Sequence, residues 1–387
     1  MDSPTSLTPR DLGGVLLVSP WYKRSLGGVA AVADLLFGLL KNAGVPTFLV
    51  VTHETNELTP DPENPNVWYI EIPAHAFSKM TCRTIVSTII RGAVAFWKIG
   101  RFVKANHIRT VVVIYPLQSA WLFRLLRLAF GTRIIVSCHG NDIRKFRALS
   151  PSGQWVLREV LKAADSIIVC ANHLATEVQD LIPSRKLAIT LIPNCVDVNY
   201  FTLPPPGFHR CENLPTIVHV SNFARKKRTT DIIEAFARAD LPPNTRLLMV
   251  GTGRGFESTI QRAIELGLGQ RVEFVGKQAD VRPFLWQADL FILASDDEGA
   301  PLVLLEAMAC GLPWVSTPWG VAATLPQGEC GLVVPPRSPS VLAEAMAELV
   351  NDPKRCSEMG LRGRRRAETD FTVQRYLDAH LKLINQF

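Results

Sequence analysis

The stretch Ala288–Thr317, which reads ADLFILASDDEGAPLVLLEAMACGLPWVST, predicts two buried strands on either side of one short helix. Residues 290–294 form a continuous apolar run of strand length, and residues 314–317 form a second. Strands that alternate with helices in this way are typical of a parallel sheet in an α/β protein.

The helix in this stretch has signals at both ends. Pro301 stands where a first helical residue belongs, because its fixed φ suits that position and its missing N–H would be unpaired there. Gly311 suits the left-handed position that closes a helix, and Pro313 prevents the helix from continuing.

Two glutamates bracket the start of this helix. Glu298 precedes it, whereas Glu306 lies about 7.5 Å along the helix axis. The free N–H groups of Ala300, Leu302 and Val303 point outward at the positive end of the helix dipole, which predicts an anion site. A diphosphate there would leave Glu298 to accept hydrogen bonds from a sugar and Glu306 to hold ribose hydroxyls. The arrangement therefore suits a nucleotide-sugar.

The segment E-G-A-P-L-V-L-L-E-A-M-A-C-G-L-P resembles the signature of the retaining, family-four glycosyltransferases of the GT-B fold. Either glutamate alone would fit an ordinary amphipathic helix with a solvated side chain, but the combined context favours the family signature. The resemblance implies an α/β protein with two Rossmann-like, doubly wound parallel-sheet domains that face a cleft. The first would bind the acceptor and the second the donor.

The order of patterns along the chain fits two such domains. Residues 1–200 are expected to form the acceptor domain, and residues 201–371 the donor domain. Prolines and a glycine between residues 203 and 215 indicate the linker. A last helix, 372–387, is expected to return to the first domain. In the first domain, Asn172 is expected to cap a helix.

Two motifs of the first domain follow predicted strands, where open α/β sheets bind ligands. Gly27 and Gly28 come after the first strand, and glycines there let a phosphate or acceptor approach the backbone, although such a pair is more often a turn. By the resemblance, His139 contacts the transferred sugar near the reacting carbon. Asp142 is expected to orient His139, although a lone histidine is more often structural.

The first strand of the second domain leads into S-N-F-A-R-K-K-R, four basic residues within one loop. A departing nucleoside diphosphate needs such charges, because negative charge grows on its β-phosphate. By the resemblance, Lys227 is the catalytic lysine. Asn222 stands where the family has an arginine, so Arg225 or Arg228 is expected to replace that arginine. This variant, with H-G-N-D and V-G-K-Q-A-D, resembles the N-acetylglucosaminyl malate synthases.

Two further segments of the second domain are expected to bind the donor. The turn G-T-G-R-G corresponds to the family's turn near the donor phosphate, which places Gly251 and Gly253 there. Its spacing differs from the G-x-G-x-x-G dinucleotide fingerprint. By the resemblance, F-V-G-K-Q-A-D-V holds the nucleobase, with Lys277 and Val281 as candidates.

Composition narrows the class of protein. The 387 residues are 47% hydrophobic and 20% charged, which fits two globular domains. The 8 cysteines include no C-x-x-C pair, which argues against zinc and a disulfide framework. The polar first dozen residues show no secretory signal, so we expect a cytoplasmic protein. No metal or other cofactor is expected, since no D-x-D occurs and the nucleotide-sugar is a co-substrate.

The net charge of +7 has a marked distribution, because no acidic residue lies between Glu71 and Asp142. The region contains Lys79, Arg83, Arg91, Lys98, Arg101, Lys104, Arg109, Arg124, Arg127 and Arg133, together with Phe96, Trp97, Phe102, Trp121 and Phe123. Two interpretations stay open: a surface for anionic lipid headgroups or an anionic acceptor, and surface helices that are basic by chance. No apolar run reaches about 18 residues, and no nucleic-acid-binding motif occurs.

We therefore expect a retaining, metal-independent hexosyltransferase that moves a sugar from a nucleotide-sugar, with a UDP-sugar as the expected donor. The acceptor would be a lipid-linked glycan or polysaccharide in cell-envelope or exopolysaccharide synthesis, with peripheral membrane contact through residues 79–133. Two alternatives stay open. A small soluble acceptor such as malate fits the S-N-F and G-K-Q resemblance, and a non-catalytic nucleotide-sugar-binding partner protein fits the arginine missing at Asn222.

Overall fold

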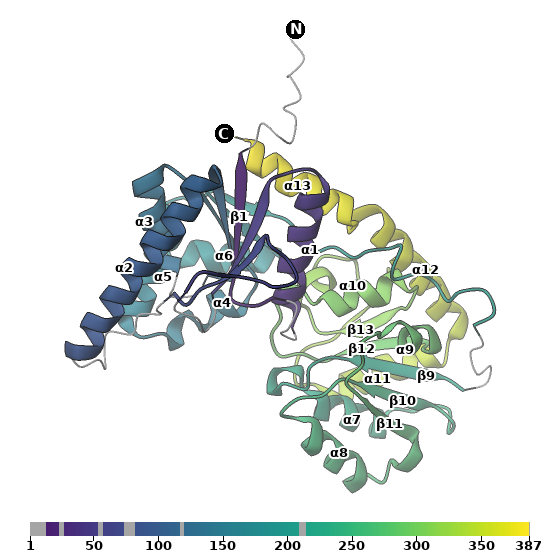
Figure 1. The fold of residues 1–387 in the computed structure, drawn as a ribbon. Helices are drawn as coiled ribbons and strands as arrows, with labels where there is room; N and C mark the ends of the chain where they lie inside the picture. The colour runs from purple at the N-terminus through teal and green to yellow at the C-terminus, as the bar shows by residue number, and fades with distance from the viewer. Residues whose placement is uncertain are drawn as a thin grey trace. The chain divides into compact units, whose positions relative to one another are not determined.

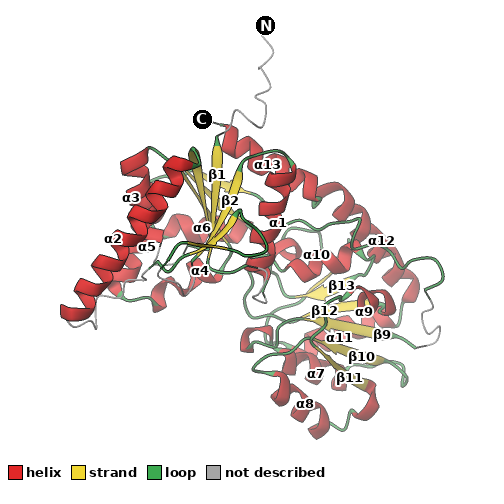
Figure 2. Ribbon diagram, viewed as in Figure 1, coloured by secondary structure: helices red, strands yellow, loops and turns green. Residues whose placement is uncertain are grey.

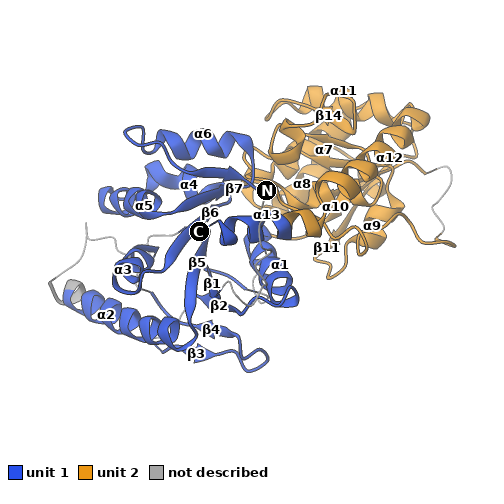
Figure 3. Cartoon of the chain, turned by 90° about the horizontal axis from the view of Figure 1, so that it is seen from above, with its two compact units in different colours: residues 1–192, 377–387 blue, residues 193–376 orange. Residues whose placement is uncertain are grey.

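The computed structural model describes residues 13–22, 27–52, 57–72, 82–116, 120–208 and 214–386, and only the backbone of residues 82–85. The chain forms two compact units (Figure 3). Unit 1 comprises residues 1–192 and 377–387, and unit 2 comprises residues 193–376.

The structure divides the chain at residue 192 and at residue 376, rather than at residues 200 and 371. The reason is packing within unit 2. The Val196 N–H donates to the Phe371 carbonyl at 2.8 Å, and Val196 is buried in a core cluster of unit 2. The Arg364 guanidinium donates to the Val198 carbonyl at 3.1 Å, so this segment belongs to unit 2.

Unit 1 is built on an eight-stranded sheet in the order β3-β4-β2-β1-β5-β6-β7-β8. The strands are β1 (Gly14–Ser19), β2 (Thr47–Val51), β3 (Thr59–Pro60), β4 (Val67–Tyr69), β5 (Ile108–Ile114), β6 (Arg133–Cys138), β7 (Ser166–Val169) and β8 (Ile189–Leu191). All paired strands are parallel except β3 with β4. The sequence patterns did not indicate the short strands β3, β4 and β8.

Helices cover both faces of this sheet (Figures 1 and 2). They are α1 (Gly28–Asn42), α2 (Cys82–Ala105), α3 (Trp121–Phe130), α4 (Asn141–Arg144), α5 (Pro151–Ala163), α6 (Asn172–Asp180) and most of α13 (Val373–Asn385). The helices α2, α3 and α5 lie side by side on one face, with α1 and α13 on the other (Figure 3). Arg133 at the start of β6 donates to the Ile384 carbonyl of α13 at 2.8 Å.

Unit 2 has a fully parallel six-stranded sheet in the order β11-β10-β9-β12-β13-β14. Its strands are β9 (Thr216–Val220), β10 (Arg246–Val250), β11 (Val272–Gly276), β12 (Leu290–Leu293), β13 (Trp314–Ser316) and β14 (Gly331–Val333). Its helices are α7 (Thr229–Arg238), α8 (Phe256–Glu265), α9 (Arg282–Gln287), α10 (Leu302–Ala309), α11 (Pro339–Val350) and α12 (Pro353–Asp370).

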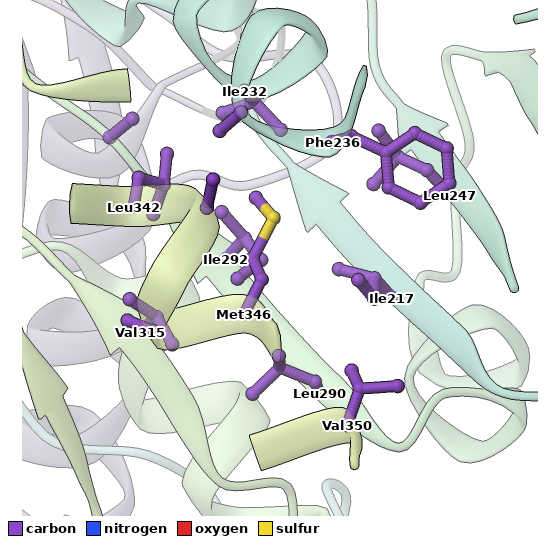
Figure 4. Close-up of a cluster of buried hydrophobic side chains, with 14 of the residues drawn as sticks. Ile217, Ile232, Phe236, Leu247, Leu290, Ile292, Val315, Leu342, Met346 and Val350 are labelled. Carbon is purple, nitrogen blue, oxygen red and sulfur yellow. The ribbon is translucent and has the colours of Figure 1, made fainter. Parts of the chain in front are cut away.

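Two hydrophobic clusters hold the helices of unit 2 to its sheet. Side chains of α7 and α11 pack on one face against Ile217 of β9, Ile292 of β12 and Val315 of β13 (Figure 4). The second cluster joins α10 and α12 to the opposite face through Phe291 and Trp314, both fully buried. Strand β12 contributes alternate residues to the two clusters, as expected for a central strand covered on both faces.

Two predicted helix starts are wrong by one residue. Pro301 is the N-cap of α10 with ψ 115°, not its first helical residue, so α10 begins at Leu302. Ala171 rather than Asn172 caps α6, and no side chain accepts a hydrogen bond there. Gly311 follows α10 with φ +77°, which confirms the predicted helix closure.

Among the helices of the described ranges, none combines the length and the apolarity needed to traverse a bilayer.

Candidate functional site

The site of unit 2 lies where its strand order reverses. Strands β9 and β12 are neighbours in the sheet although two strands and three α-helices lie between them in the chain. Each continues at its carboxyl end into a loop that carries charged residues. Open α/β sheets bind ligands outside the carboxyl ends of strands at such a reversal. Here the reversal brings the loop 221–228 together with the loop 294–301.

A buried ion pair joins these two loops. Lys227 Nζ lies 2.5 Å from Glu298 Oε1, and their exposed fractions are 9% and 8%. Lys226 approaches the other carboxylate oxygen of Glu298 at 3.4 Å. Burial acts to raise the pKa of Glu298, but the charges of Lys227 and Lys226 outweigh it and hold the pKa below the usual value. Glu298 is therefore a carboxylate at neutral pH.

The two arginines of the loop differ in their surroundings. Arg228 has φ 51°. Its guanidinium forms an ion pair with the Asp231 carboxylate, with contacts at 2.8 Å and 2.9 Å. Arg228 also lies 3.8 Å from Asp296. The Arg225 side chain is exposed and makes no ion pair with another described residue. Asn222 is exposed as well.

The glycine turn 251–255 holds the basic loop in place through Phe223, which is fully buried. The Phe223 N–H donates to the Thr252 carbonyl at 3.0 Å, and the Gly255 N–H donates to the Phe223 carbonyl at 2.7 Å. A Cβ on Gly251 would lie 1.8 Å from the Ser221 carbonyl oxygen, and one on Gly253 2.9 Å from the Phe223 nitrogen. Close backbone approach therefore requires glycine at both predicted positions.

The start of α10 has the free backbone N–H groups that the prediction of an anion site requires. The N–H groups of Leu302 and Val303 lie in the first turn, where no carbonyl of the same helix is available to them. Asn194 fixes the preceding loop, because its Nδ2 donates to the Ala300 carbonyl at 2.8 Å. Glu298 precedes this turn, so the structure brings the predicted carboxylate, lysine and helix start to the same edge of one sheet.

Glu306 lies on the second turn of α10 and is half-buried. Burial raises the pKa of its carboxyl group to about 7. Lys277 and Val281 follow β11, the edge strand of the sheet. Lys277 is exposed, and Val281 is the N-cap of α9.

Models of known families match both halves of the chain. Residues 27–195 match the glycosyl transferase 4-like domain, and residues 208–366 match the glycosyl transferases group 1. The chain belongs to the group 1 glycosyltransferases. The predicted resemblance and the predicted GT-B fold are thereby confirmed.

Several relatives of this transferase have assigned activities. It is 28% identical to the N-acetyl-alpha-D-glucosaminyl L-malate synthase of Bacillus anthracis over 73% of its own length and 76% of that enzyme. It is also 28% identical to a GDP-mannose-dependent phosphatidylinositol monomannoside mannosyltransferase of Corynebacterium glutamicum, over 63% of its own length and 68% of that enzyme. The similarity to the malate synthases therefore matches the predicted one.

Solved structures share its fold. The Anabaena protein HepE, in complex with UDP, superposes with a TM-score of 0.80 at 16% identity, over 97% of this chain and 100% of that chain. The sucrose-phosphate synthase of Thermosynechococcus elongatus gives a TM-score of 0.78 at 21% identity, over 97% and 98%. At these identities the likeness concerns the fold alone.

In unit 1 of the transferase, His139 follows β6 and is half-buried. Its Nε2 lies 3.0 Å from the Ser137 hydroxyl, and its backbone N–H donates to the Asp142 carboxylate at 3.0 Å and 3.1 Å. The prediction that Asp142 orients this histidine is therefore correct only for the backbone, since Ser137 contacts the ring. Burial, with a contribution from His380, lowers the pKa of His139 to about 4, so its ring is neutral.

The strand order of unit 1 reverses between β1 and β5. A small pocket lies there, lined by Val18, Pro20, Thr52, Val113, Ile114, Tyr115, Ala120 and Phe123. Tyr115 has φ 58° and packs edge-on against Trp21. Gly27 is the N-cap of α1 with φ 153°, and a Cβ there would meet open space, so the conformation rather than crowding requires glycine. Gly28 is the first residue of α1 and is exposed.

The sequence patterns missed two residues that position the loops of the candidate site. His219 of β9 is fully buried, with Nδ1 2.9 Å from the Ile292 carbonyl and Nε2 2.7 Å from the Ser221 hydroxyl. A carbonyl only accepts, so Nδ1 carries the proton and Nε2 accepts from Ser221. The second missed residue is Asn194, which positions Ala300. Both act through partners far away in sequence, and no local motif marks such partners.

Proposed function

We propose that the protein transfers a hexose from a nucleotide-sugar, with a UDP-sugar as the expected donor, to a lipid-linked or polysaccharide acceptor with retention of configuration. The observation that carries the proposal is the buried Lys227–Glu298 pair at the reversal of the unit 2 sheet, beside the free N–H groups of α10. Supporting it are the family and relatives that act on sugars and on phosphatidylinositol mannosides.

In the proposed donor complex the diphosphate contacts the N–H groups of Leu302 and Val303 at the positive end of α10. Lys227 and the exposed Arg225 supply the charge that stabilises the departing β-phosphate. Glu298 accepts hydrogen bonds from the sugar, and Glu306 accepts them from the ribose. Gly251 and Gly253 let the phosphates approach the backbone, while Lys277 and Val281 lie where the nucleobase is expected.

The proposed reaction balances without a covalent intermediate on the protein. The bond between the anomeric carbon and the β-phosphate oxygen breaks, and a bond from the acceptor oxygen to the same face of that carbon forms. The acceptor proton passes to the departing phosphate. Cations of the protein stabilise the charge that develops, so the proposal needs no divalent metal, and we expect activity to persist in a chelator.

Nucleotide binding tests the donor most directly. UDP, GDP and ADP are titrated against thermal unfolding, where a ligand at 100 times its Kd stabilises the protein by about 2.7 kcal/mol. UDP is expected to stabilise most. Slow hydrolysis of a UDP-sugar should then disappear in Glu298→Ala and Lys227→Ala, and persist in the exposed controls Glu344→Ala and Lys354→Ala. A protein that binds no nucleotide would contradict the proposal.

A small soluble acceptor remains the second candidate, and the specific observation in its favour is the likeness to the malate synthase. Product analysis with malate and with a glycolipid acceptor separates the two. A protein that binds UDP but hydrolyses and transfers nothing would instead be a nucleotide-sugar-binding partner.

A further inference from the structure

Helix α2 has two apolar faces, although a surface helix needs only one. Its inner face carries Ala95, Ile99, Phe102 and Val103, which are all buried in unit 1. The Phe102 ring packs edge-on against Phe48 at 5.3 Å between ring centres. This face accounts for the attachment of α2 to the sheet, as expected of an amphipathic helix.

The opposite face of α2 points to solvent and is also apolar. Val86, Ile90, Val94 and Trp97 recur at spacings of four, four and three residues, which places them in one stripe. Their exposed fractions are 55%, 57%, 41% and 57%. Ile89 beside the stripe is 58% exposed. Single exposed apolar residues are ordinary, but a contiguous stripe marks a surface that binds something.

The position of α2 leaves this stripe accessible within unit 1. The helix lies along the outer edge of unit 1, and α3 packs on its inner side (Figure 3). Gly92 and Gly100 face that inner side, where a Cβ would lie 3.0 Å from the Trp121 ring and 2.7 Å from the Phe130 ring. Helix α3 therefore packs beside the stripe and does not cover it, since Ile90 and Trp97 are both 57% exposed.

Basic side chains border the stripe, and the acidic residue Glu71 is paired with Arg91 of α2 at 3.2 Å. Arg101 lies one turn beyond Trp97, with its guanidinium 4.7 Å from the centre of the Trp97 ring, and Lys104 is exposed on the next turn. No acidic residue occurs between Glu71 and Asp142.

Three other arginines of this region make polar contacts inside unit 1. Arg124 pairs with Glu159 at 2.6 Å, and Arg127 pairs with Asp165. Arg133 donates to carbonyls of α13. The predicted basic surface is thus narrower than the sequence indicates. Arg101 and Lys104 make no ion pair within the described part of the chain, and both border the apolar stripe of α2.

We propose that the outward stripe of α2 is the surface by which this protein lies on a bilayer that contains anionic lipids. The apolar side chains enter the headgroup boundary with the helix parallel to the membrane, and Arg101 and Lys104 contact lipid phosphates. A second copy of the chain is a poorer occupant, because a symmetric contact would bring the same positive charges together. The inference deepens the proposed function and rests on it for the presence of the acceptor in a membrane.

Vesicle flotation with the full chain tests this inference. The vesicles contain phosphatidylglycerol and phosphatidylcholine in equal parts, or phosphatidylcholine alone. The wild type is expected to float with the anionic vesicles, and Ile90→Ser/Trp97→Ser should lower the apparent affinity by at least about tenfold. The matched control is Ile264→Ser/Leu361→Ser, which removes two exposed apolar side chains of unit 2 and should float like wild type.

The charge contribution has its own variants. Arg101→Glu/Lys104→Glu should lose binding to the anionic vesicles, whereas Lys354→Glu, at an exposed lysine of unit 2, should not. If the serine double variant fails to fold, Val94→Asp alone gives the same test. Absence of flotation, equal flotation of the α2 variants, or an α2-dependent dimer in place of vesicle binding would overturn the inference.

The test separates this inference from the donor chemistry. The α2 variants should keep the wild-type stabilisation by UDP and the wild-type hydrolysis of a UDP-sugar. Normal hydrolysis without vesicle binding overturns the membrane surface alone. Vesicle binding without any stabilisation by nucleotide supports the membrane surface and contradicts the proposed function.

Discussion

At the scale of single residues, unit 2 contains a charge pair that is almost completely buried. Lys227 and Glu298 are nearly buried and face each other at 2.5 Å. Removing one partner of such a pair leaves the other charge buried without compensation, which is far more destabilising than losing a surface pair. The pair therefore has a structural role besides the catalytic one that we propose.

We predict that Glu298→Gln lowers the free energy of unfolding of unit 2 by on the order of 3 kcal/mol. The depressed pKa of Glu298 means that its stabilisation is complete above the ordinary glutamate pKa and is lost as the pH falls through the depressed value. The variant should therefore lose less stability in acid than wild type. Hydrogen exchange of β9 and β12 amides in denaturant measures both effects. Exposed Glu344→Gln is the control, and equal acid sensitivity in both variants would refute the role of the pair.

Glu306 leads to a prediction about pH and nucleotide affinity. Its pKa in the free protein is about 7, and ribose hydroxyls that donate to it would favour the ionised form and lower that pKa. Binding then releases a proton below about pH 7, so the affinity for UDP should rise up to about pH 7 and level off above it. Calorimetric titration measures this trend. Glu306→Gln should retain only the pH dependence of the phosphate itself, and an unchanged profile in that variant would count against the ribose contact.

The sequence suggested these glutamates as site residues but did not indicate the residues that position the loops around Glu298. Glu298, Glu306 and Lys227 stand in contiguous motifs, so local pattern and family resemblance suggest them as candidates. Asn194 and His219 contribute through hydrogen bonds to Ala300 and Ile292, over 100 and over 70 residues away. Such contacts exist only once the sheet has formed, and a single sequence does not show them.

At the scale of elements, the loop after β9 contains both candidates for the missing family arginine, and their surroundings distinguish them. Arg228 stands before α7 and is bound to Asp231 in the first turn of that helix. Arg225 is exposed on the same loop. We expect Arg225 to act in transfer and Arg228 to act in folding.

We predict opposite effects on kcat and on stability in the variants of these two arginines. Arg225→Ala should lower kcat for transfer by about 100-fold, the usual effect of removing one group that stabilises developing charge, and leave stability unchanged. Arg228→Ala should lower the thermal midpoint of unit 2 and affect kcat less. Steady-state kinetics and thermal unfolding of both variants decide the matter. Loss of kcat in Arg228→Ala at full stability would reverse the assignment.

The turn 251–255 is an element for which we expect both a role in folding and a role in phosphate binding. The sequence predicts Gly251 as a phosphate-binding residue, and the structure adds a packing reason, since a Cβ would lie 1.8 Å from the Ser221 carbonyl oxygen. We predict that Gly251→Ala destabilises unit 2 by more than about 3 kcal/mol through strain and displacement of the basic loop. Gly267→Ala is the control, because φ is +66° there and nothing lies within 4 Å of the added Cβ. Thermal unfolding compares them, and equal losses would exclude the close approach as the cause.

The helix boundaries show how far local sequence signals can predict the structure. Pro301 and Asn172 both suit the start of a helix, yet α10 and α6 start one residue away from the predicted positions. A proline is compatible with the N-cap as well as the first turn, and only tertiary contacts decide between them. The strand β3 of two residues pairs antiparallel at the sheet edge and carries no periodic pattern that could have been recognised.

At the scale of the whole molecule, the alternation of strands and helices predicts two parallel sheets. Both sheets are observed, with one antiparallel pair, β3 with β4, at the edge of the sheet in unit 1. The chain returns to unit 1 at its end. Helix α13 begins in unit 2, and from residue 377 onward it belongs to unit 1. Its apolar residues Leu377, Leu383 and Ile384 are buried, and a helical stripe of this kind can be read from the sequence. The unit boundary at residue 192 could not be predicted from the sequence, because it depends on which unit Val196 packs against.

The contribution of α13 gives a prediction that separates the units. Leu383→Ala/Ile384→Ala removes two buried side chains from unit 1, where each such truncation costs about 2 kcal/mol or more. Total domain stability is typically about 5–15 kcal/mol, so protection of unit 1 amides against hydrogen exchange should fall sharply. Unit 2 amides should keep their protection, and UDP should still stabilise them, because the proposed donor site lies wholly within unit 2. Leu361→Ala, an exposed leucine of α12, controls for the substitution itself. If protection fell equally in both units, the chain would unfold as one cooperative body, and the return of α13 would stabilise the whole transferase rather than its first unit.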